Sequence, residues 1–149
     1  MRAVIQRVKV ASVEVEEKVV GRIRRGFFIL LGIQRYDTAA DIPWMVDKII
    51  NLRIFEKEDG KFDKSLLDIN GELLIVSQFT LYGDCSKGRR PSFSDAMEAA
   101  GAKIIFDLFV EKAKEKILIV ETGIFQTLMN ISLVNEGPVT VILDSKKSG

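Results

Sequence analysis

The sequence predicts an α+β fold, in which a curved, mainly antiparallel sheet or open β-barrel carries two helices in a single domain. Apolar runs typical of strands outnumber those typical of helices, and neighbouring runs are close enough to form hairpins. The 149 residues, 47% of them hydrophobic, provide one core and leave no room for a second domain. We find no repeat or linker that would divide the chain.

Three strands are predicted before residue 35. Val8 and Val10 share one phase of strand alternation, whereas Val13 and Val15 share the other, which predicts a bulge near Ala11-Ser12. The stretch VVGRI follows as a second strand. The stretch GFFILLGIQ is apolar on both faces, which is typical of a central strand.

The first helix is predicted to follow Asp37 or Thr38, since either side chain can cap it. Pro43 fits its first turns, and apolar residues recur at helical spacing at Ile42, Val46, Ile49 and Ile50. NLRIFE then returns to strand. After the turn signals Asp59-Gly60 and Asn70-Gly71, ELLIVSQFTL is predicted as one long, mostly buried strand.

The second helix is predicted to follow the polar loop YGDCSKGRRPSF and to begin effectively at Gly101. Its centre is expected at Ile104, Ile105, Leu108, Phe109 and Ala113. Strands around ILIVE, MNISLV and PVTVIL close the chain, and only the tail SKKSG is expected to fray. Between the last two strands, Pro138 has no N–H for a ladder and Gly137 has no side chain to pack.

The composition excludes several kinds of active site. The chain has no histidine and one cysteine, Cys85, so Ser-His-Asp and Cys-His systems are excluded, as are the common zinc sites. Neither a metal nor a cofactor is expected. The net charge of +1 attracts nucleic acid only through a local basic patch. FFILLGI is too short to span a membrane and MRAVIQRVKV is no signal peptide, so we expect a cytoplasmic protein without a membrane partner.

Two polar stretches exceed what a core requires. Ser77-Gln78-Phe79-Thr80 ends an apolar strand with groups that can face a cleft, although any one of them could simply satisfy the backbone there. The stretch from Asn135 to Thr140 is, by itself, ordinary turn chemistry. Near the first stretch lies a basic cluster, Lys87, Arg89 and Arg90, which suits phosphate contact, a solvated loop or pairing across a dimer.

Four segments in this order, SQFTLYGD, KGRRPSFSDA, ETGIF and LVNEGPVT, resemble the D-aminoacyl-tRNA deacylase family. The resemblance extends from MRAVIQRV at the first residue to VILDS near the last, so residues 1–149 are interpreted as one D-aminoacyl-tRNA deacylase domain. The pairing of SQFTL with Asn-x-Gly-Pro-x-Thr is the specific part of this resemblance.

The resemblance implies a homodimer that hydrolyses the ester between tRNA and a D-amino acid, or a mischarged glycine, as chiral proofreading in translation quality control. It implies that the Gly137–Pro138 bond is cis and enters the partner's active site as a chirality gate, with Asn135 and Thr140 in the substrate site. A cis bond costs about 0.5–1 kcal/mol before proline, against roughly 3–4 before another residue.

The resemblance also implies that Phe125 and Met129 line the pocket for the terminal adenosine. The chain departs from the family pattern beside them, because Gln126-Thr127 stands where many members have Gly-Ala. Glu136 replaces Asp at a variable position of the motif. Phe125 is therefore open to two readings, as a platform for adenine or as a core aromatic.

The chemistry needs no histidine, because an aminoacyl ester is already activated. Backbone N–H groups of Phe79 and Thr80 can stabilise the developing oxyanion. Thr80 is a nucleophile by type, but the only nearby base is Asp84, so the ribose 2′-OH is the better candidate to assist attack. We assign Thr80 to positioning, Gln78 to the terminal ribose or adenosine, and Ser77 to shaping the site.

Two other classes of function stay open. A catalytically inert RNA-binding module would bind tRNA without cleaving the ester, although the chain lacks the aromatic signature of an RNA-recognition motif. A hydrolase of small D-aminoacyl esters or amides would cleave free esters, and neutralising its basic loop would cost it no activity.

Overall fold

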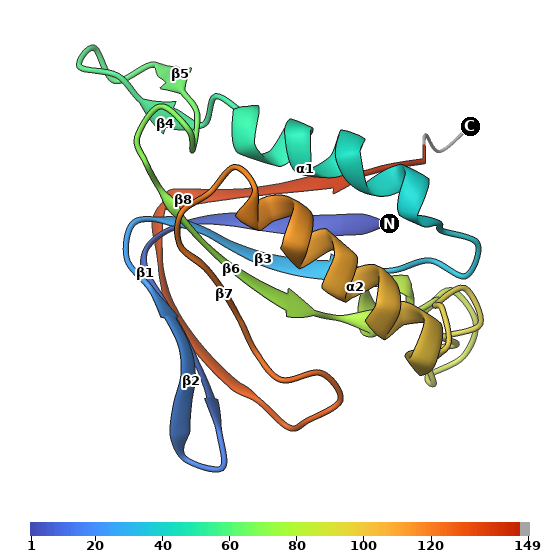
Figure 1. The fold of residues 1–149 in the computed structure, drawn as a ribbon. Helices are drawn as coiled ribbons and strands as arrows, with labels where there is room; N and C mark the ends of the chain where they lie inside the picture. The colour runs from blue at the N-terminus through green and yellow to red at the C-terminus, as the bar shows by residue number, and fades with distance from the viewer. Residues whose placement is uncertain (147–149) are drawn as a thin grey trace.

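A curved six-stranded sheet organises residues 1–146, the part of the chain described by this computed structural model (Figure 1). The strand order is β2-β1-β3-β6-β7, and β8 pairs with β1. The predicted α+β class is confirmed, including the nearly barrel-shaped sheet. Residues 147–149, which end both the predicted domain and the predicted tail, lie outside the described residues. The sheet strands are β1 (Arg2–Val15), β2 (Lys18–Ile23), β3 (Gly26–Gly32), β6 (Glu72–Ser77), β7 (Val120–Thr122) and β8 (Asn130–Asp144).

Strand β1 joins the two halves of the sheet because it pairs with three other strands. It runs antiparallel to β3 from Arg2 to Val8, to β2 from Ala11 to Val15, and to β8 along most of its length. The pairs β3–β6 and β6–β7 are parallel. The sheet is therefore mixed, with the predicted antiparallel majority.

The bulge predicted near Ala11-Ser12 was misplaced. The register shifts against β2 between Val13 and Glu14, and against β8 on both sides of Val8. The phase argument failed because Val10 is 49% exposed, so this apolar side chain does not mark the buried face.

Two α-helices, among residues 1–146, cover the same face of the sheet (Figure 1). Thr38 caps a short 3-10 turn, η1 (Ala39–Asp41), and α1 (Ile42–Asn51) follows with Pro43 in its first turn. All four apolar positions predicted for this helix are buried. Helix α2 (Ala99–Lys114) begins before Gly101, because the Glu98 carboxylate accepts hydrogen bonds from the N–H groups of Ala100 and Gly101.

The buried face of α2 is shifted from the predicted one. Ile105, Phe109 and Ala113 are buried as expected, but Ile104 and Leu108 are 63% and 46% exposed. Phe106 and Val110 take their places in the core. The apolar stripe of this helix is thus wider than the surface the sheet can cover.

The long strand predicted for ELLIVSQFTL ends at Ser77. Gln78 leaves the ladder, and Phe79–Tyr82 form a 3-10 turn, η2. The sequence suggested a longer strand because apolar residues continue into η2, where Tyr82 is also buried. This change of direction turns the polar stretch away from the sheet.

The strand predicted for NLRIFE is reduced to β4 (Phe55–Glu56), which pairs with β5 (Phe62–Lys64) as a projecting hairpin (Figure 1). Gly60 lies at its turn with φ +81°. At the other end of the chain, the first residues of the predicted tail are held, since the N–H of Ser145 donates to the carbonyl of Met1 over 2.9 Å.

The strands predicted for MNISLV and PVTVIL form one strand, β8, that continues past Pro138. Pairing with β1 is interrupted between Asn135, opposite Val8, and Thr140, opposite Gln6. The intervening residues, Glu136–Val139, bulge out with only Arg7 facing them, and we call this segment the motif bulge. A missing N–H at Pro138 is tolerated there because no ladder bond is required.

The core has two parts. The larger lies between the helices and the sheet, and the smaller fills the curl made by β2, β6 and the far ends of β1 and β8. Within residues 1–146, no helix is long and apolar enough to cross a membrane.

Candidate active site

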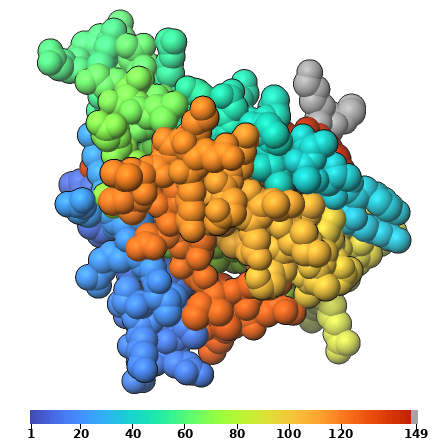
Figure 2. Space-filling view, viewed as in Figure 1, coloured from blue at the N-terminus to red at the C-terminus, as the bar shows by residue number. Residues whose placement is uncertain are grey.

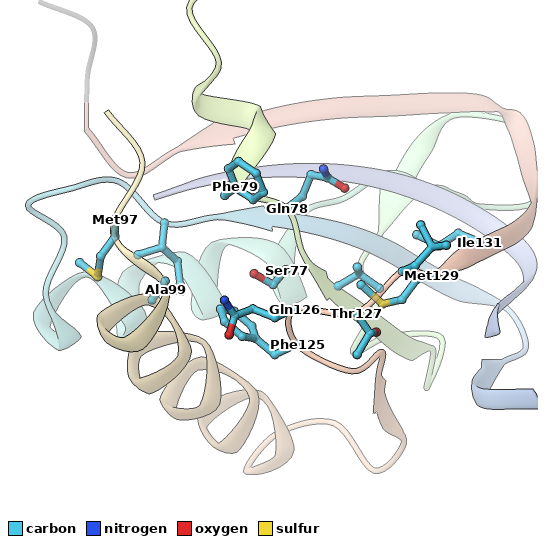
Figure 3. A pocket seen from close by; sticks show the side chains of 14 residues that line it. Ser77, Gln78, Phe79, Met97, Ala99, Phe125, Gln126, Thr127, Met129 and Ile131 are labelled. Atoms are coloured by element: carbon cyan, nitrogen blue, oxygen red, sulfur yellow. The ribbon is translucent and has the colours of Figure 1, made fainter. Parts of the chain in front are cut away.

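A cavity of about 460 Å³ opens where β6 ends, between the start of α2 and the segment that joins β7 to β8 (Figure 3). The space-filling view shows the surface hollowed beside α2 (Figure 2). A volume of this size suits a nucleoside. The lining residues are Ile33, Val76, Ser77, Gln78, Phe79, Met97, Ala99, Ala102, Phe125, Gln126, Thr127, Leu128, Met129 and Ile131.

The stretch Ser77-Gln78-Phe79-Thr80 lies at the mouth of this cavity. Ser77, Gln78 and Phe79 line it, whereas Thr80 stands just outside the lining and accepts a hydrogen bond on Oγ1 from Nε2 of Gln78. The Phe79 ring is 55% exposed and packs edge-on against Phe93, with ring centroids 5.1 Å apart. Thr80 therefore orients Gln78 directly.

The backbone of η2 leaves donors free at the same place. The first N–H groups of a helical turn have no partner within it. Among residues 1–146, those of Phe79 and Thr80 donate to no other group, while Leu81 donates to the carbonyl of Gln78 over 3.3 Å. Two free donors at neighbouring positions can bind an oxyanion.

Asp84 is poorly suited to act as a base for Thr80. Its carboxylate accepts the N–H of Ser86 over 2.9 Å. The side-chain hydroxyl and the backbone N–H of Ser86 hold the pKa of Asp84 below its usual range. A carboxylate with a lowered pKa is a weaker base.

The Phe125 side chain lines the cavity and also packs against the core. A platform for adenine and a core aromatic are therefore compatible roles for it. Its ring lies 6.1 Å from that of Phe106, inclined at 44°, and also lines the cavity. The turn behind it is tied by Thr127, whose hydroxyl donates to the carbonyl of Ile124 over 2.9 Å. Met129 lines the neighbouring wall. Sequence reasoning missed Ile33, Met97, Ala102 and Ile131, since apolar residues from separate elements carry no local signal.

The Gly137–Pro138 bond is cis, as the resemblance implies. Among the described residues that line the cavity, none comes from the segment Asn135 to Thr140. The motif bulge faces Arg7, which pairs with Phe27 near the start of β3, whereas Ser77 pairs with Leu31 near its end. Within one chain, therefore, the bulge and the cavity lie at different ends of the sheet.

Two side chains brace the motif bulge. Oδ1 of Asn135 accepts the N–H of Val139 over 2.8 Å, and Nδ2 of Asn135 donates to Oγ1 of Thr140 over 3.0 Å. Arg7, 4% exposed, donates from Nε to the carbonyl of Glu136 and from a terminal nitrogen to that of Ile54, both over 2.9 Å. Asn135 and Thr140 thus hold the shape of the bulge.

Sequence reasoning missed Arg7, although a signal was available. Arg7 shares the strand phase of Ala3 and Ile5, which are both fully buried. A charged residue in a buried phase requires specific partners.

The basic cluster lies on an exposed loop. Asp84 and Ser92 close the loop through paired backbone hydrogen bonds of 2.7 and 2.9 Å. Lys87, Arg89 and Arg90 are exposed between them and, within residues 1–146, form no ion pair. They are free to meet an anion.

The curved sheet, the cavity at the end of β6 and the braced Gly-Pro bulge define a class, that of α+β proteins with a nucleoside-sized site at the end of a central strand. The particular family follows from its model, described as D-Tyr-tRNA(Tyr) deacylase, which matches residues 4–144. The chain belongs to this family of ester hydrolases.

Curated relatives agree with this assignment, and two solved structures share the fold. The D-aminoacyl-tRNA deacylases of Thermosipho africanus and Kosmotoga olearia are 60% and 57% identical to this chain over 147 residues, which is 99% of each sequence. The structure titled c-Myc DNA Unwinding Element Binding Protein matches with a TM-score of 0.93 and 41% identity, over 99% of this chain and 100% of that one. A probable eukaryotic D-amino acid tRNA deacylase shares the fold, with a TM-score of 0.85 and 19% identity over 95% and 97% of the two chains.

Proposed function

We propose that the protein hydrolyses the ester bond of D-aminoacyl-tRNA to give a free D-amino acid and tRNA. The observation that carries this proposal is the cavity at the end of β6, with two free backbone donors at its mouth. The family and the names of its curated relatives support the substrate class.

The terminal adenosine of tRNA enters the cavity, where its base stacks on Phe125. The pocket is largely apolar, with polar groups at Ser77 and Gln78, which suits a base and a ribose together. Gln78 holds the ribose or the base, Thr80 holds Gln78, and Ser77 shapes the floor. The reactive ester then lies beside η2.

Hydrolysis proceeds by addition of water to the ester carbonyl. The carbonyl oxygen takes up negative charge, which the N–H groups of Phe79 and Thr80 stabilise. The neighbouring 2′-OH assists proton transfer from the attacking water. The carbon–oxygen bond to the ribose then breaks, and the ribose oxygen receives the proton.

The motif bulge acts in a second copy of the chain. Because the bulge and the cavity lie at different ends of the sheet in one protomer, a homodimer that places one beside the other would complete the site. The carbonyl groups of Gly137 and Pro138 then occupy the space that an L side chain requires. A D-amino acid directs its side chain elsewhere, and glycine has none, so mischarged glycyl-tRNA is also a substrate.

The exposed cluster Lys87, Arg89 and Arg90 contacts phosphates of the acceptor end. Removal of D-amino acids and misplaced glycine from tRNA protects translation, which places the protein in the cytoplasm as a quality-control enzyme.

Single-turnover deacylation of matched D- and L-aminoacyl-tRNAs tests this function. We expect release of the D-amino acid and little release of the L-amino acid. Binding without cleavage of either substrate would indicate an inert RNA-binding module. Equally fast cleavage of a D-aminoacyl ester without tRNA would indicate a hydrolase of small esters, and both outcomes contradict the proposal.

A further inference from the structure

Gln126 adopts a backbone conformation that glutamine rarely takes. Its φ is +59°, in the left-handed region that favours glycine and, among other residues, Asn and Asp. Among residues 1–146, the other non-glycine residues with positive φ are Glu16, Glu17 and Asn70, which lie in turns outside the cavity. Strained residues that the surrounding structure holds in place cluster at functional sites.

The side chain of Gln126 points along the cavity. Figure 3 shows it between Ser77 and Phe125, with its amide directed toward the start of α2. The hydroxyl of Thr127 holds the turn from the other side by its bond to Ile124. The strained backbone thus places an amide in the cavity wall next to Phe125, on which a base would stack.

The amide of Gln126 is also uncommitted. The amide of Gln78 donates to Thr80, and the hydroxyl of Thr127 donates to the backbone. Within the described part of the chain, no hydrogen bond is formed by the side chain of Gln126. It therefore offers a donor and an acceptor side by side to whatever fills the cavity.

We propose that Gln126 recognises the base of the terminal nucleotide, reading adenine through paired hydrogen bonds to its amino group and an adjacent ring nitrogen. A glutamine amide matches adenine in this way, whereas a purine without the amino group offers only the ring nitrogen and loses one of the two hydrogen bonds. Stacking on Phe125 accepts any base, so the discrimination comes from Gln126. This inference rests on the proposed function for the occupant of the cavity.

Equilibrium binding of uncharged tRNA tests the inference without requiring catalysis. Fluorescence anisotropy would compare tRNA ending in adenosine with tRNA ending in purine riboside, which lacks the amino group. We expect the wild-type protein to bind the adenosine form about tenfold more tightly. Gln126→Gly should bind both forms equally, because it removes the amide and suits the positive φ.

The matched control is Glu17→Gly, which relieves a φ of +66° in the β1–β2 turn, outside the cavity. This variant should retain the tenfold preference. Selective binding that Gln126→Gly preserves, or a wild-type protein that binds both tRNAs alike, would overturn the inference. Tighter binding of AMP than of tRNA would assign the cavity to a free nucleotide and overturn it too. Failure to cleave D-aminoacyl-tRNA, with the binding preference intact, would count against the proposed function alone.

Discussion

At the scale of single residues, Arg7 shows how a buried charge can be retained. Its guanidinium group satisfies two backbone carbonyls from distant segments and lies 3.6 Å from the carboxylate of Glu56. A planar guanidinium can hold several acceptors in fixed directions, which an ammonium group cannot. Arg7 thereby ties the motif bulge to the segment before β4.

Replacement of Arg7 by Lys tests this bracing. Arg7→Lys should lower the free energy of unfolding by about 1–3 kcal/mol, since at least one buried carbonyl loses its donor. Selectivity for D- over L-aminoacyl-tRNA should fall as the bulge loosens. Urea denaturation and paired deacylation assays measure the two effects. Arg24→Lys is the control, because Arg24 is 82% exposed and should tolerate the change.

Gly137 has little room for a side chain. A Cβ there would lie 2.8 Å from Val139 and 3.0 Å from the guanidinium of Arg7, at a φ of +136°. Gly137→Ala should cost about 1–3 kcal/mol and reduce D/L selectivity by displacing the bulge. Gly60→Ala, at a φ of +81° with nothing within 4 Å, is the matched control for backbone strain and should leave selectivity unchanged. Unchanged selectivity in Gly137→Ala would show that the bulge is no gate.

We propose a positioning role for Thr80, since its hydroxyl accepts a hydrogen bond from the amide of Gln78. Thr80→Ala should fold and lose no more than about tenfold in deacylation rate, the effect of one hydrogen bond. Removal of the terminal 2′-OH should cost more than about a hundredfold, the size of a missing proton-transfer group. Isolation of a covalent aminoacyl-enzyme on Thr80 would contradict both expectations.

Residue types at the site were partly readable from the sequence. Ser77, Gln78 and Phe125 stand out by motif, and Arg7 could have been found by its strand phase. The positive φ of Gln126 could not, because backbone conformation depends on the packing of Phe125 and the bond from Thr127. The sequence showed that Gln126 replaces the Gly of many family members, but it did not show where the Gln126 side chain points.

At the scale of elements, the loop between η2 and α2 determines where the basic cluster stands. If Lys87, Arg89 and Arg90 contact phosphates, their combined replacement by Ala should weaken tRNA binding. The slope of log K against log salt should decrease by roughly 0.7–0.9 for each phosphate that the variant no longer binds. Replacement of Lys112, Lys114 and Lys116 near the end of α2 removes the same charge and should leave the slope nearly unchanged. Equal effects of the two triple variants would show that the loop contributes only nonspecific charge to tRNA binding.

The pKa of Asp84 sets the pH range over which its hydrogen bonds with Ser86 stabilise this loop. Because Ser86 lowers that pKa in the folded protein, the stabilisation is fully present above the ordinary value of 3.8 and is lost as the pH falls through the lower folded value. Salt titrations near neutral pH therefore report phosphate contacts without a change in the loop.

Element types were easier to predict than element ends. Strand β6 and the turn η2 look like one strand in the sequence because apolar residues continue into η2, where Tyr82 is buried although the strand has ended at Ser77. Likewise, Gly137-Pro138 predicted a break between two strands, whereas β1 pairs with β8 on both sides of it. Long-range pairing overrode local sequence in each case.

At the scale of the whole molecule, the proposed function needs two chains for each site. Activity should fall on dilution below the dimer dissociation constant. A Gln78→Ala chain mixed with a Gly137→Ala chain should recover activity and D/L selectivity, because one hybrid site combines an intact cavity with an intact bulge. Sedimentation would verify that hybrids form. If hybrids form but activity and D/L selectivity do not recover, the motif bulge acts on the cavity of its own chain.

The fold class was predictable because strand and helix periods are local properties. The curved sheet was part of that prediction, but the pairing of β1 with three different strands was not, since it depends on contacts between distant segments. The cavity lies where β6 ends in this curved sheet.

The pairing of β1 with β8 also sets an order of events during synthesis. The two strands stand at opposite ends of the described chain, so one edge of β1 stays open on the ribosome until β8 emerges. Contacts of such long sequence separation form late and slow folding. Because the motif bulge belongs to β8, a nascent chain lacks both the complete sheet and the bulge, and it acquires both in the same step.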